Sequence, residues 1–249
     1  MKLILVLLLA LAPFSAVADD WPQWFGPRRD GVWRETGVLD KFPEGGPKVL
    51  WRTPIRRGYA GPAVVNNRVY LMDRQVDQSA DAKRQSARTG AQPGSERLLC
   101  LDASTGEILW EESYPCAYTM SYPAGPRVTP LVNEERVYTF GAEGLLLCRA
   151  ARDGAEIWQH DFKERFGIKT QTWGFAASPL IHGDLLICLA GGAGSTAVAF
   201  HKKTGKEIWR SLTAAQPGYC PPQLVSHKGN DLLIIWHPES VNALDPKTG

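Results

Sequence analysis

The stretch Leu-Leu-Cys-Leu-Asp-Ala-Ser-Thr-Gly-Glu-Ile-Leu-Trp, residues 98–110, decides the fold. An apolar run, a polar turn and a second apolar run ending in Trp110 predict two antiparallel strands joined by a tight turn. The pattern returns at 147–158, 198–209 and 242–249, and successive turn glycines are 48, 51 and 44 residues apart. A period of this length predicts an array of repeated supersecondary units. The turn glycines are Gly106, Gly154, Gly205 and Gly249.

A second strand-turn-strand segment precedes each of these units and begins after a proline. Pro62 is followed by a short apolar run, a turn at 66–67 and another apolar run at 68–70. Turns this short permit only antiparallel pairing, so each repeat holds four antiparallel strands. Four-stranded units repeated in this way predict an all-β protein, a β-propeller. The corresponding prolines of the later repeats are Pro130, Pro179 and Pro222.

The N-terminus has the pattern of a secretory signal peptide. Lys2 precedes an apolar run at 3–12, and Ala16-Val17-Ala18 is an A-x-A cleavage site. We therefore expect export to the periplasm or the extracellular space after cleavage near Ala18. The expected organisation is a signal peptide at 1–18, a lead-in at 19–46 and a propeller at 47–249, with blades at about 59–112, 122–162, 173–213 and an incomplete one at 219–249.

The segment 47–55 resembles the last strand of a blade without the three strands that should precede it. Its Lys-Val-Leu-Trp-Arg sequence matches Lys206 to Arg210 of the third blade. Such a strand closes a propeller ring by completing the final blade. Either the four units close on themselves, or the chain is a piece of a longer ring. We favour the longer ring, of seven or eight blades, because the sequence stops inside a hairpin turn at Gly249.

Composition narrows the possible partners. Lys2 is the only charged residue of the signal segment, so the remaining chain has 27 Lys and Arg against 26 Asp and Glu. This balance favours neither nucleic acid nor an anionic membrane as a partner. No later apolar run is long enough for a transmembrane helix. We expect a monomer.

Five cysteines are present, and two of them occupy the same position of the repeat. Cys100 and Cys148 each precede a turn glycine by six residues, where later repeats have alanine, which predicts unpaired core thiols. A disulfide between Cys116 and Cys220 stays open, because spacing alone gives no geometry.

The repeat motif itself has a structural explanation. An Asp side chain can accept bonds from backbone groups two residues later, and Gly can adopt the positive φ that closes the turn. The following Trp provides a large apolar surface for the neighbouring blade. We assign this structural role to Asp102, Gly106, Trp110, Gly154, Trp158, Gly205 and Trp209.

Binding residues are expected on the irregular face. In up-and-down blades, the first and third turns share one face, the regular face, while the longer connections share the other, the irregular face. Variable loops on a rigid scaffold are the usual place for binding. We expect 74–97 to be a mobile surface loop on that face. Candidate binding residues are Arg74, Tyr122, Arg127, Trp173, Trp236 and His237, and the wider rim also includes Tyr118, Tyr219 and Glu239.

No catalytic signature is found. The sequence lacks G-x-S-x-G, H-E-x-x-H, C-x-x-C and P-loop motifs. The glycine-rich run 191–195 opens no helix, so it does not predict a phosphate site. The five histidines are dispersed, without metal-ligand spacing. No catalytic or metal residue is predicted.

The motif Ala/Cys-Leu-Asp-x-x-Thr-Gly-x-x-x-Trp, complete at 100–110 and partial in the other repeats, resembles that of the pyrroloquinoline-quinone-type (PQQ-like) repeat propellers. The opening Asp-Trp-Pro-Gln-Trp-Phe-Gly-Pro at 20–27 is similar to the lead-in of exported BamB-like or quinoprotein-like members. The resemblance implies a non-catalytic envelope scaffold that binds protein, peptide or glycan and needs no cofactor. The alternative is a PQQ- and Ca²⁺-dependent dehydrogenase of alcohols or sugars, although the adjacent cysteines common in such enzymes are missing. A propeller hydrolase or lyase is a third possibility.

Overall fold

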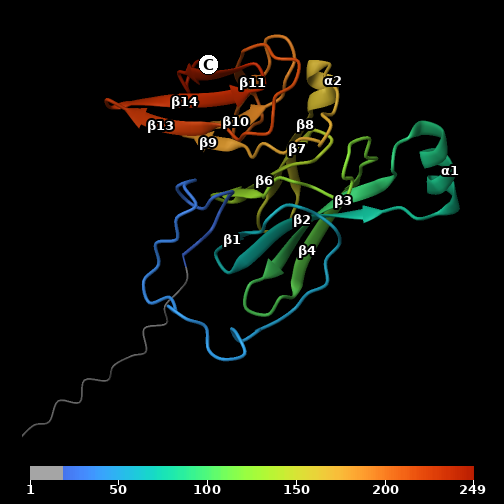
Figure 1. Ribbon diagram of the computed structural model, residues 1–249, viewed down its shortest axis with the longest axis vertical. Helices are drawn as coiled ribbons and strands as arrows, with labels where there is room; N and C mark the ends of the chain where they lie inside the picture. Colours follow the sequence, from blue (N-terminus) through green and yellow to red (C-terminus); the bar gives the residue numbers. More distant parts are fainter. Residues whose placement is uncertain (1–18) are drawn as a thin grey trace, which may run out of the picture.

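A computed structural model describes residues 19–249, which form four antiparallel sheets in chain order (Figure 1). Three sheets have four strands and the last has three, and in each the spatial order follows the sequence order. This is the arrangement of consecutive propeller blades, so the predicted all-β propeller fold is confirmed. The proposed signal peptide at 1–18 lies outside the described residues.

The strands are short and joined by tight turns. The first blade holds β1 (Ala63–Val65), β2 (Arg68–Val76), β3 (Gly94–Asp102) and β4 (Ile108–Pro115). The second holds β5 (Leu131–Asn133), β6 (Arg136–Phe140), β7 (Leu145–Ala150) and β8 (Glu156–Asp161). The third holds β9 (Leu180–His182), β10 (Leu185–Leu189), β11 (Ala197–His201) and β12 (Glu207–Ser211). The fourth holds β13 (Gln223–His227), β14 (Asn230–His237) and β15 (Ser240–Leu244). A helix, α1 (Ala80–Thr89), lies between β2 and β3 of the first blade. A shorter helix, α2 (Phe162–Phe166), follows the last strand of the second blade.

A tryptophan joins each blade to the next. Trp158 of β8 is 9% exposed and lies over Gly205, where an added Cβ would be 2.7 Å from the indole ring. The indole N–H of Trp158 also donates to the Lys202 carbonyl of the same turn, at 3.2 Å. Glycine is required at this turn because φ is +70° and the ring leaves no room for a side chain. The same contact recurs for Trp110 on Gly154 and for Trp209 on Gly249.

The turn aspartates hold the hairpins closed. Asp102 Oδ1 accepts hydrogen bonds from the backbone N–H groups of Ser104 and Thr105, at 2.8 and 2.9 Å. Asp245 makes the same pair of bonds in the fourth blade. The third repeat has His201 at this position, and its turn closes through the backbone bond from Gly205 N–H to the His201 carbonyl.

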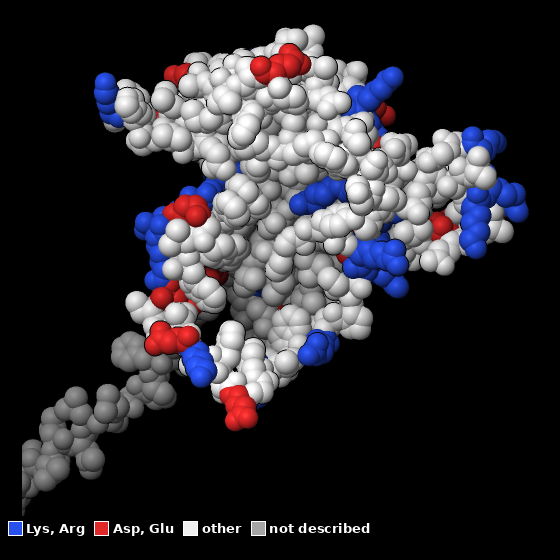
Figure 2. Space-filling model, viewed as in Figure 1, with Lys and Arg blue, Asp and Glu red and all other residues white. Residues whose placement is uncertain are grey.

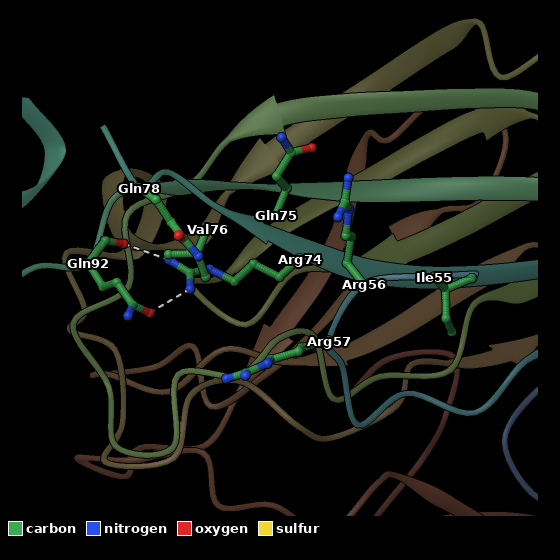
Figure 3. Close-up of a pocket in the computed structure, with 8 residues that line it drawn as sticks. All are labelled: Ile55, Arg56, Arg57, Arg74, Gln75, Val76, Gln78 and Gln92. Atoms are coloured by element: carbon green, nitrogen blue, oxygen red, sulfur yellow. Dashed lines mark hydrogen bonds between the residues drawn. The ribbon is translucent and has the colours of Figure 1, made fainter. Parts of the chain in front are cut away.

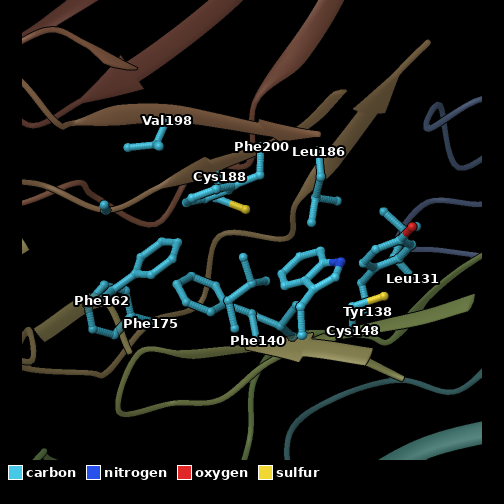
Figure 4. Close-up of a cluster of buried hydrophobic side chains, with 14 residues drawn as sticks. Leu131, Tyr138, Phe140, Cys148, Phe162, Phe175, Leu186, Cys188, Val198 and Phe200 are labelled. Atoms are coloured by element: carbon cyan, nitrogen blue, oxygen red, sulfur yellow. The ribbon is translucent and has the colours of Figure 1, made fainter. Parts of the chain in front are cut away.

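The largest core lies between the second and third blades (Figure 4). Phe140 packs between Phe162 and Phe175, at centroid distances of 4.9 and 5.2 Å. Trp158 and Phe200 extend this aromatic cluster towards the third blade. Burial of such large side chains is the main source of adhesion between the blades.

His160 gives this core a predicted pH dependence. Its ring stacks on Phe200 at 4.6 Å, and Nε2 lies 2.7 Å from the Gly205 carbonyl oxygen, which fits a neutral Nε2–H donor. Burial lowers the pKa of His160 below its ordinary value of 6.5. The folded state therefore disfavours the protonated ring, and the free energy of unfolding should decrease as the pH falls below 6.5 towards the lowered pKa.

Urea denaturation at about pH 7.5 and about pH 5 checks this expectation. The decrease should be smaller in His160→Gln than in the unchanged protein. His227→Gln, at an exposed position of β13, is the control and should keep the full decrease. An identical decrease in His160→Gln would contradict the assignment.

The lead-in crosses the inner strands of all four blades. Trp21 exchanges two backbone hydrogen bonds with Val64 of β1, and the Pro22 carbonyl accepts from Val132 N–H of β5. Arg29 then reaches the proline carbonyls that precede β9 and β13, those of Pro179 and Pro222, at 2.8 and 3.1 Å. Burial lowers the pKa of Arg29 to about 10. The segment thus ties the blades together along their inner edge.

The strand expected at 47–55 does not form. These residues are described, and none of them belongs to a strand. No neighbouring strand in the described chain lies beside them to complete a ladder. Trp51 nevertheless contacts Gly106 and donates its indole N–H to the Ala103 carbonyl at 2.8 Å. Trp51 therefore packs on the Gly106 turn of the first blade as Trp158 packs on the Gly205 turn of the third.

The expectation of a mobile loop at 74–97 is wrong. β2 continues to Val76, β3 begins at Gly94, and α1 lies between them. Ser79 caps the helix by accepting from Ala82 N–H, and Gly90 ends it with a φ of +72°. The helix carries no apolar stripe, so periodicity could not reveal it. Strands and helix together form an arm that projects from the blade (Figure 1).

The cysteines are all free in the described chain. Cys100 and Cys148 are buried in their strands, as predicted, and Cys116 and Cys220 are not joined. Burial raises the pKa of Cys148 to about 12, which makes it a poor nucleophile. Among residues 19–249, no helix has the length and apolar character needed to cross a bilayer.

Candidate functional site on the irregular face

The loops that lead into successive blades touch one another on the irregular face. Arg127, before the second blade, lies under Tyr59, with its guanidinium carbon 5.2 Å from the ring centroid. Its Nε donates to the Trp173 carbonyl, before the third blade, at 2.7 Å. Trp173 in turn lies 5.3 Å from the ring of Tyr219, before the fourth blade, and its N–H donates to the Tyr219 hydroxyl. Four aromatic residues, Tyr59, Tyr122, Trp173 and Tyr219, therefore form what we call the aromatic ridge.

Arg127 holds the ridge in place. Besides the Trp173 carbonyl, its guanidinium donates to the carbonyls of Ser121, Tyr122 and Gly125. A planar guanidinium with five donors can fix several backbone carbonyls at once. The sequence placed Arg127 on the rim, and the structure shows it as a support beneath the ridge.

Three ridge side chains are open to solvent, and Tyr59 is 54% exposed. Tyr122 is 70% exposed and Trp173 is 52% exposed. Tyr122 has a φ of +53°, a conformation that is uncommon for a residue with a side chain. Large aromatic side chains held on rigid backbone bind partners at a low entropic cost.

Arg74 lies buried beside the ridge. It is only 1% exposed and stacks on Tyr118, with its guanidinium carbon 3.9 Å from the ring centroid. Nη1 donates to Gln92 Oε1 at 2.6 Å and to the Pro123 carbonyl at 3.0 Å. The expected loop residue is thus a strand residue inside a polar network, and burial lowers its pKa.

Glu96 joins the first blade to the second. It is fully buried and accepts from the hydroxyls of Tyr114 and Tyr118 and from Ala142 N–H. Burial raises the pKa of Glu96, although these donors act against the rise. An added Cβ at Gly141 would collide with the Glu96 carboxylate, so the second blade must approach with glycine at that position.

Glu143 makes an equivalent connection one blade further on. It accepts from Thr119 N–H at 2.7 Å, from the Lys163 ammonium at 2.8 Å and from the Thr170 hydroxyl. Burial opposes ionisation, but these donors together hold the pKa of Glu143 below its usual range. The loops after the first and second blades are therefore fixed to the same carboxylate.

The candidates of the fourth blade lie apart from this network. Trp236 is 60% exposed, whereas His237 is 4% exposed and bonds Ser240 and Asn242 within its own turn. Glu239 accepts from Ala215 N–H at 3.1 Å. The structure therefore brings Arg74, Tyr118, Tyr122, Arg127, Trp173 and Tyr219 together and leaves Trp236, His237 and Glu239 at a separate turn.

Sequence reasoning missed Tyr59, Glu96 and Glu143. Glu96 had a usable signal, because an acidic residue directly before an apolar strand run must find buried partners. Tyr59 lies three residues before Pro62, the offset that Arg127 has from Pro130. A comparison of residues at the same distance before each repeat proline would have identified Tyr59 as a candidate.

The buried carboxylates do not fit a calcium site. Among residues 19–249, no three His, Cys, Asp or Glu side chains are grouped as metal ligands. Glu96 and Glu143 already accept from internal donors, and Asp73 is held by the Arg97 guanidinium at 2.7 and 2.8 Å. Calcium prefers six to eight oxygen ligands, which these residues do not offer. No step through calcium or PQQ follows from this part of the chain.

Four-stranded antiparallel blades joined by Trp-to-Gly contacts define a repeat β-propeller, and its irregular face carries exposed aromatic side chains. The chain belongs to the family whose model is described as outer membrane protein assembly factor BamB, which matches residues 94–249. No curated protein matched the sequence.

Solved structures of similar proteins include a BamB and a quinohemoprotein alcohol dehydrogenase. BamB from Moraxella catarrhalis is 18% identical over 62% of this chain and 42% of that one, with a TM-score of 0.41. The quinohemoprotein alcohol dehydrogenase from Comamonas testosteroni is 20% identical over 77% of this chain and 27% of that one, with a TM-score of 0.48. The chain spans less than half the length of either protein.

Proposed function

We propose that the chain is a non-catalytic binding or scaffold module of the cell envelope, and that its aromatic ridge binds a protein, peptide or glycan partner. The observation that carries the proposal is the exposure of Tyr122 and Trp173 on loops that Arg127 holds rigid. Aromatic side chains on a rigid support are typical of binding hot spots. The family description, which names an outer membrane assembly factor, supports an envelope location.

The arrangement of charges also favours binding over catalysis. The buried carboxylates beside the ridge, those of Glu96 and Glu143, already accept hydrogen bonds that join loops and blades. A general base must reach the proton that it removes, and neither carboxylate is exposed. These groups therefore act as supports of the binding face.

An affinity capture with matched variants tests the proposal. Immobilised full-length protein is mixed with a cell-envelope extract, and retained components are quantified by mass spectrometry. Tyr122→Ala/Trp173→Ala should reduce retention of the specific components by more than about tenfold, since hot-spot aromatics contribute 2 kcal/mol or more. Ile108→Ala/Ile208→Ala removes exposed apolar side chains beside the regular turns. This control variant should retain the specific envelope components fully.

Full retention of the specific components by both double variants would contradict the proposal. Dye reduction with an alcohol or sugar that depends on added PQQ and Ca²⁺ would instead favour the quinoprotein alternative. Retention lost equally in both variants would indicate a folding defect, which circular dichroism of each variant identifies. We expect both to keep the unchanged β-sheet spectrum.

A further inference from the structure

A cavity of about 650 Å³ lies at the base of the β2–β3 arm (Figure 3). Its polar lining consists of Arg56, Arg57, Arg74, Gln75, Gln78 and Gln92, and includes no Asp or Glu. The arm above it is also basic, because α1 carries Lys83, Arg84 and Arg88 (Figure 2). The cavity therefore has the donors and the charge for an anionic group.

Arg74 is an unusually placed member of this lining. The side chain is 1% exposed, and within residues 19–249 it forms no ion pair with a carboxylate. Its Nη atoms donate only to neutral acceptors of Gln92, Pro93 and Pro123, and its Nε is buried without a hydrogen-bond partner. Glu96 provides a counter-charge opposite Arg74 in the β2–β3 pair, but its oxygens accept from Tyr114, Tyr118 and Ala142, so the Arg74 Nε–H stays without an acceptor.

The two other arginines have unused side chains. Arg56 and Arg57 are exposed, and neither guanidinium has a hydrogen bond or ion pair within the described chain. Their backbone is nevertheless fixed, since the Arg57 carbonyl accepts from Arg74 N–H at 2.8 Å and Arg56 N–H donates to Asp73 at 2.6 Å. Asp73 is itself paired with Arg97, so it does not neutralise the cavity. The Arg56 and Arg57 side chains point to different sides of the cavity that Arg74 also lines (Figure 3).

The cavity is the end of a longer groove. It shares Gln75, Val76 and Gln78 with a neighbouring cavity of about 750 Å³, which extends past Gly94 and Cys116 and has Asp77 as its one acidic lining residue. A groove formed by two adjoining cavities suits a chain segment better than a single small acid.

We propose that this groove binds an acidic peptide segment, with one of its carboxylates on the Arg56 guanidinium and another on that of Arg57. The guanidinium group matches a carboxylate with two parallel hydrogen bonds. The inference rests on the proposed binding function and names the chemistry of a partner on the irregular face.

The test measures fluorescence anisotropy of a labelled Glu-rich peptide with the full-length protein. A Gln-for-Glu peptide of the same length should bind at least about tenfold more weakly, as expected for loss of a charge-assisted bond. Arg56→Gln/Arg57→Gln should weaken the Glu peptide by about tenfold or more. Lys48→Gln/Arg52→Gln removes the same charge from the same segment, outside the cavity, and should change the affinity by less than about twofold.

Several results would overturn the proposal. These are equal binding of the Glu and Gln peptides, equal weakening in both double variants, or competition by succinate or inorganic phosphate at the peptide's own concentration. The proposed function is tested separately, because it requires Tyr122 and Trp173. If the Glu peptide fails to bind while Tyr122→Ala/Trp173→Ala still loses its envelope partner, only the acidic-peptide assignment is wrong.

Discussion

Trp158→Ala is expected to lower the free energy of unfolding by about 3–5 kcal/mol. The indole is 9% exposed and belongs to the core between the second and third blades. Its removal leaves a cavity against Gly205 and deprives the Lys202 carbonyl of a donor. Chemical denaturation followed by tryptophan fluorescence and by circular dichroism measures the change.

Trp236→Ala is the matched control for this prediction. Trp236 is 60% exposed, so its truncation should cost less than about 1 kcal/mol. Similar losses in the two variants would show that the Trp158 contact does not join the blades.

Gly205→Ala is expected to cost about 2–5 kcal/mol. A φ of +70° is unfavourable for alanine by about 1–2 kcal/mol. The added methyl group would also lie 2.7 Å from the Trp158 ring, and overpacking of this kind costs about 1–3 kcal/mol more.

Gly183→Ala separates the backbone effect from the steric one. Gly183 has a φ of +58° in the β9–β10 turn, and no atom lies within 4 Å of an added Cβ. The free energy of unfolding of Gly183→Ala should therefore decrease only by the backbone cost of about 1–2 kcal/mol. If thermal denaturation gives Gly205→Ala no larger loss than Gly183→Ala, the packing of the indole on the turn is not tight.

The blade fold could be predicted because it depends on local signals that repeat. The turn at Asp102 and Gly106 and the Trp that follows need only a few neighbouring residues to specify a hairpin. Because the same pattern occurs in four copies, the copies together predict the fold more strongly than one hairpin could. The same reasoning placed Trp51 in register with Trp209, although no strand forms around it.

The arm could not be predicted from apolar periodicity. α1 is polar on all sides, and its evidence lies in the capping residues Ser79 and Gly90. Arg74 was assigned to a loop because the stretch 74–97 is polar and turn-rich, yet stacking on Tyr118 and bonds to Gln92 let the strand continue through it. Contacts between residues distant in sequence decided the outcome here.

The arrangement of the irregular face was predicted only in outline. Topology correctly separated regular turns from irregular connections, because antiparallel strands place alternate turns at opposite ends. It could not show that the half-buried Arg127 binds the carbonyls of neighbouring loops while Tyr122 stays 70% exposed. That distinction depends on side-chain packing between loops of different blades.

Site-specific photo-crosslinking tests the central claim, that the irregular face binds the partner. A benzophenone amino acid is placed at Tyr122 or Trp173 on the ridge, and at Ile108 or Ile208 beside the regular turns, all four being exposed positions. Irradiation in the intact cell envelope should give adducts of defined mass at the two ridge positions and none at the two others. Adducts that form only at Ile108 and Ile208, or equally at all four positions, would contradict the account.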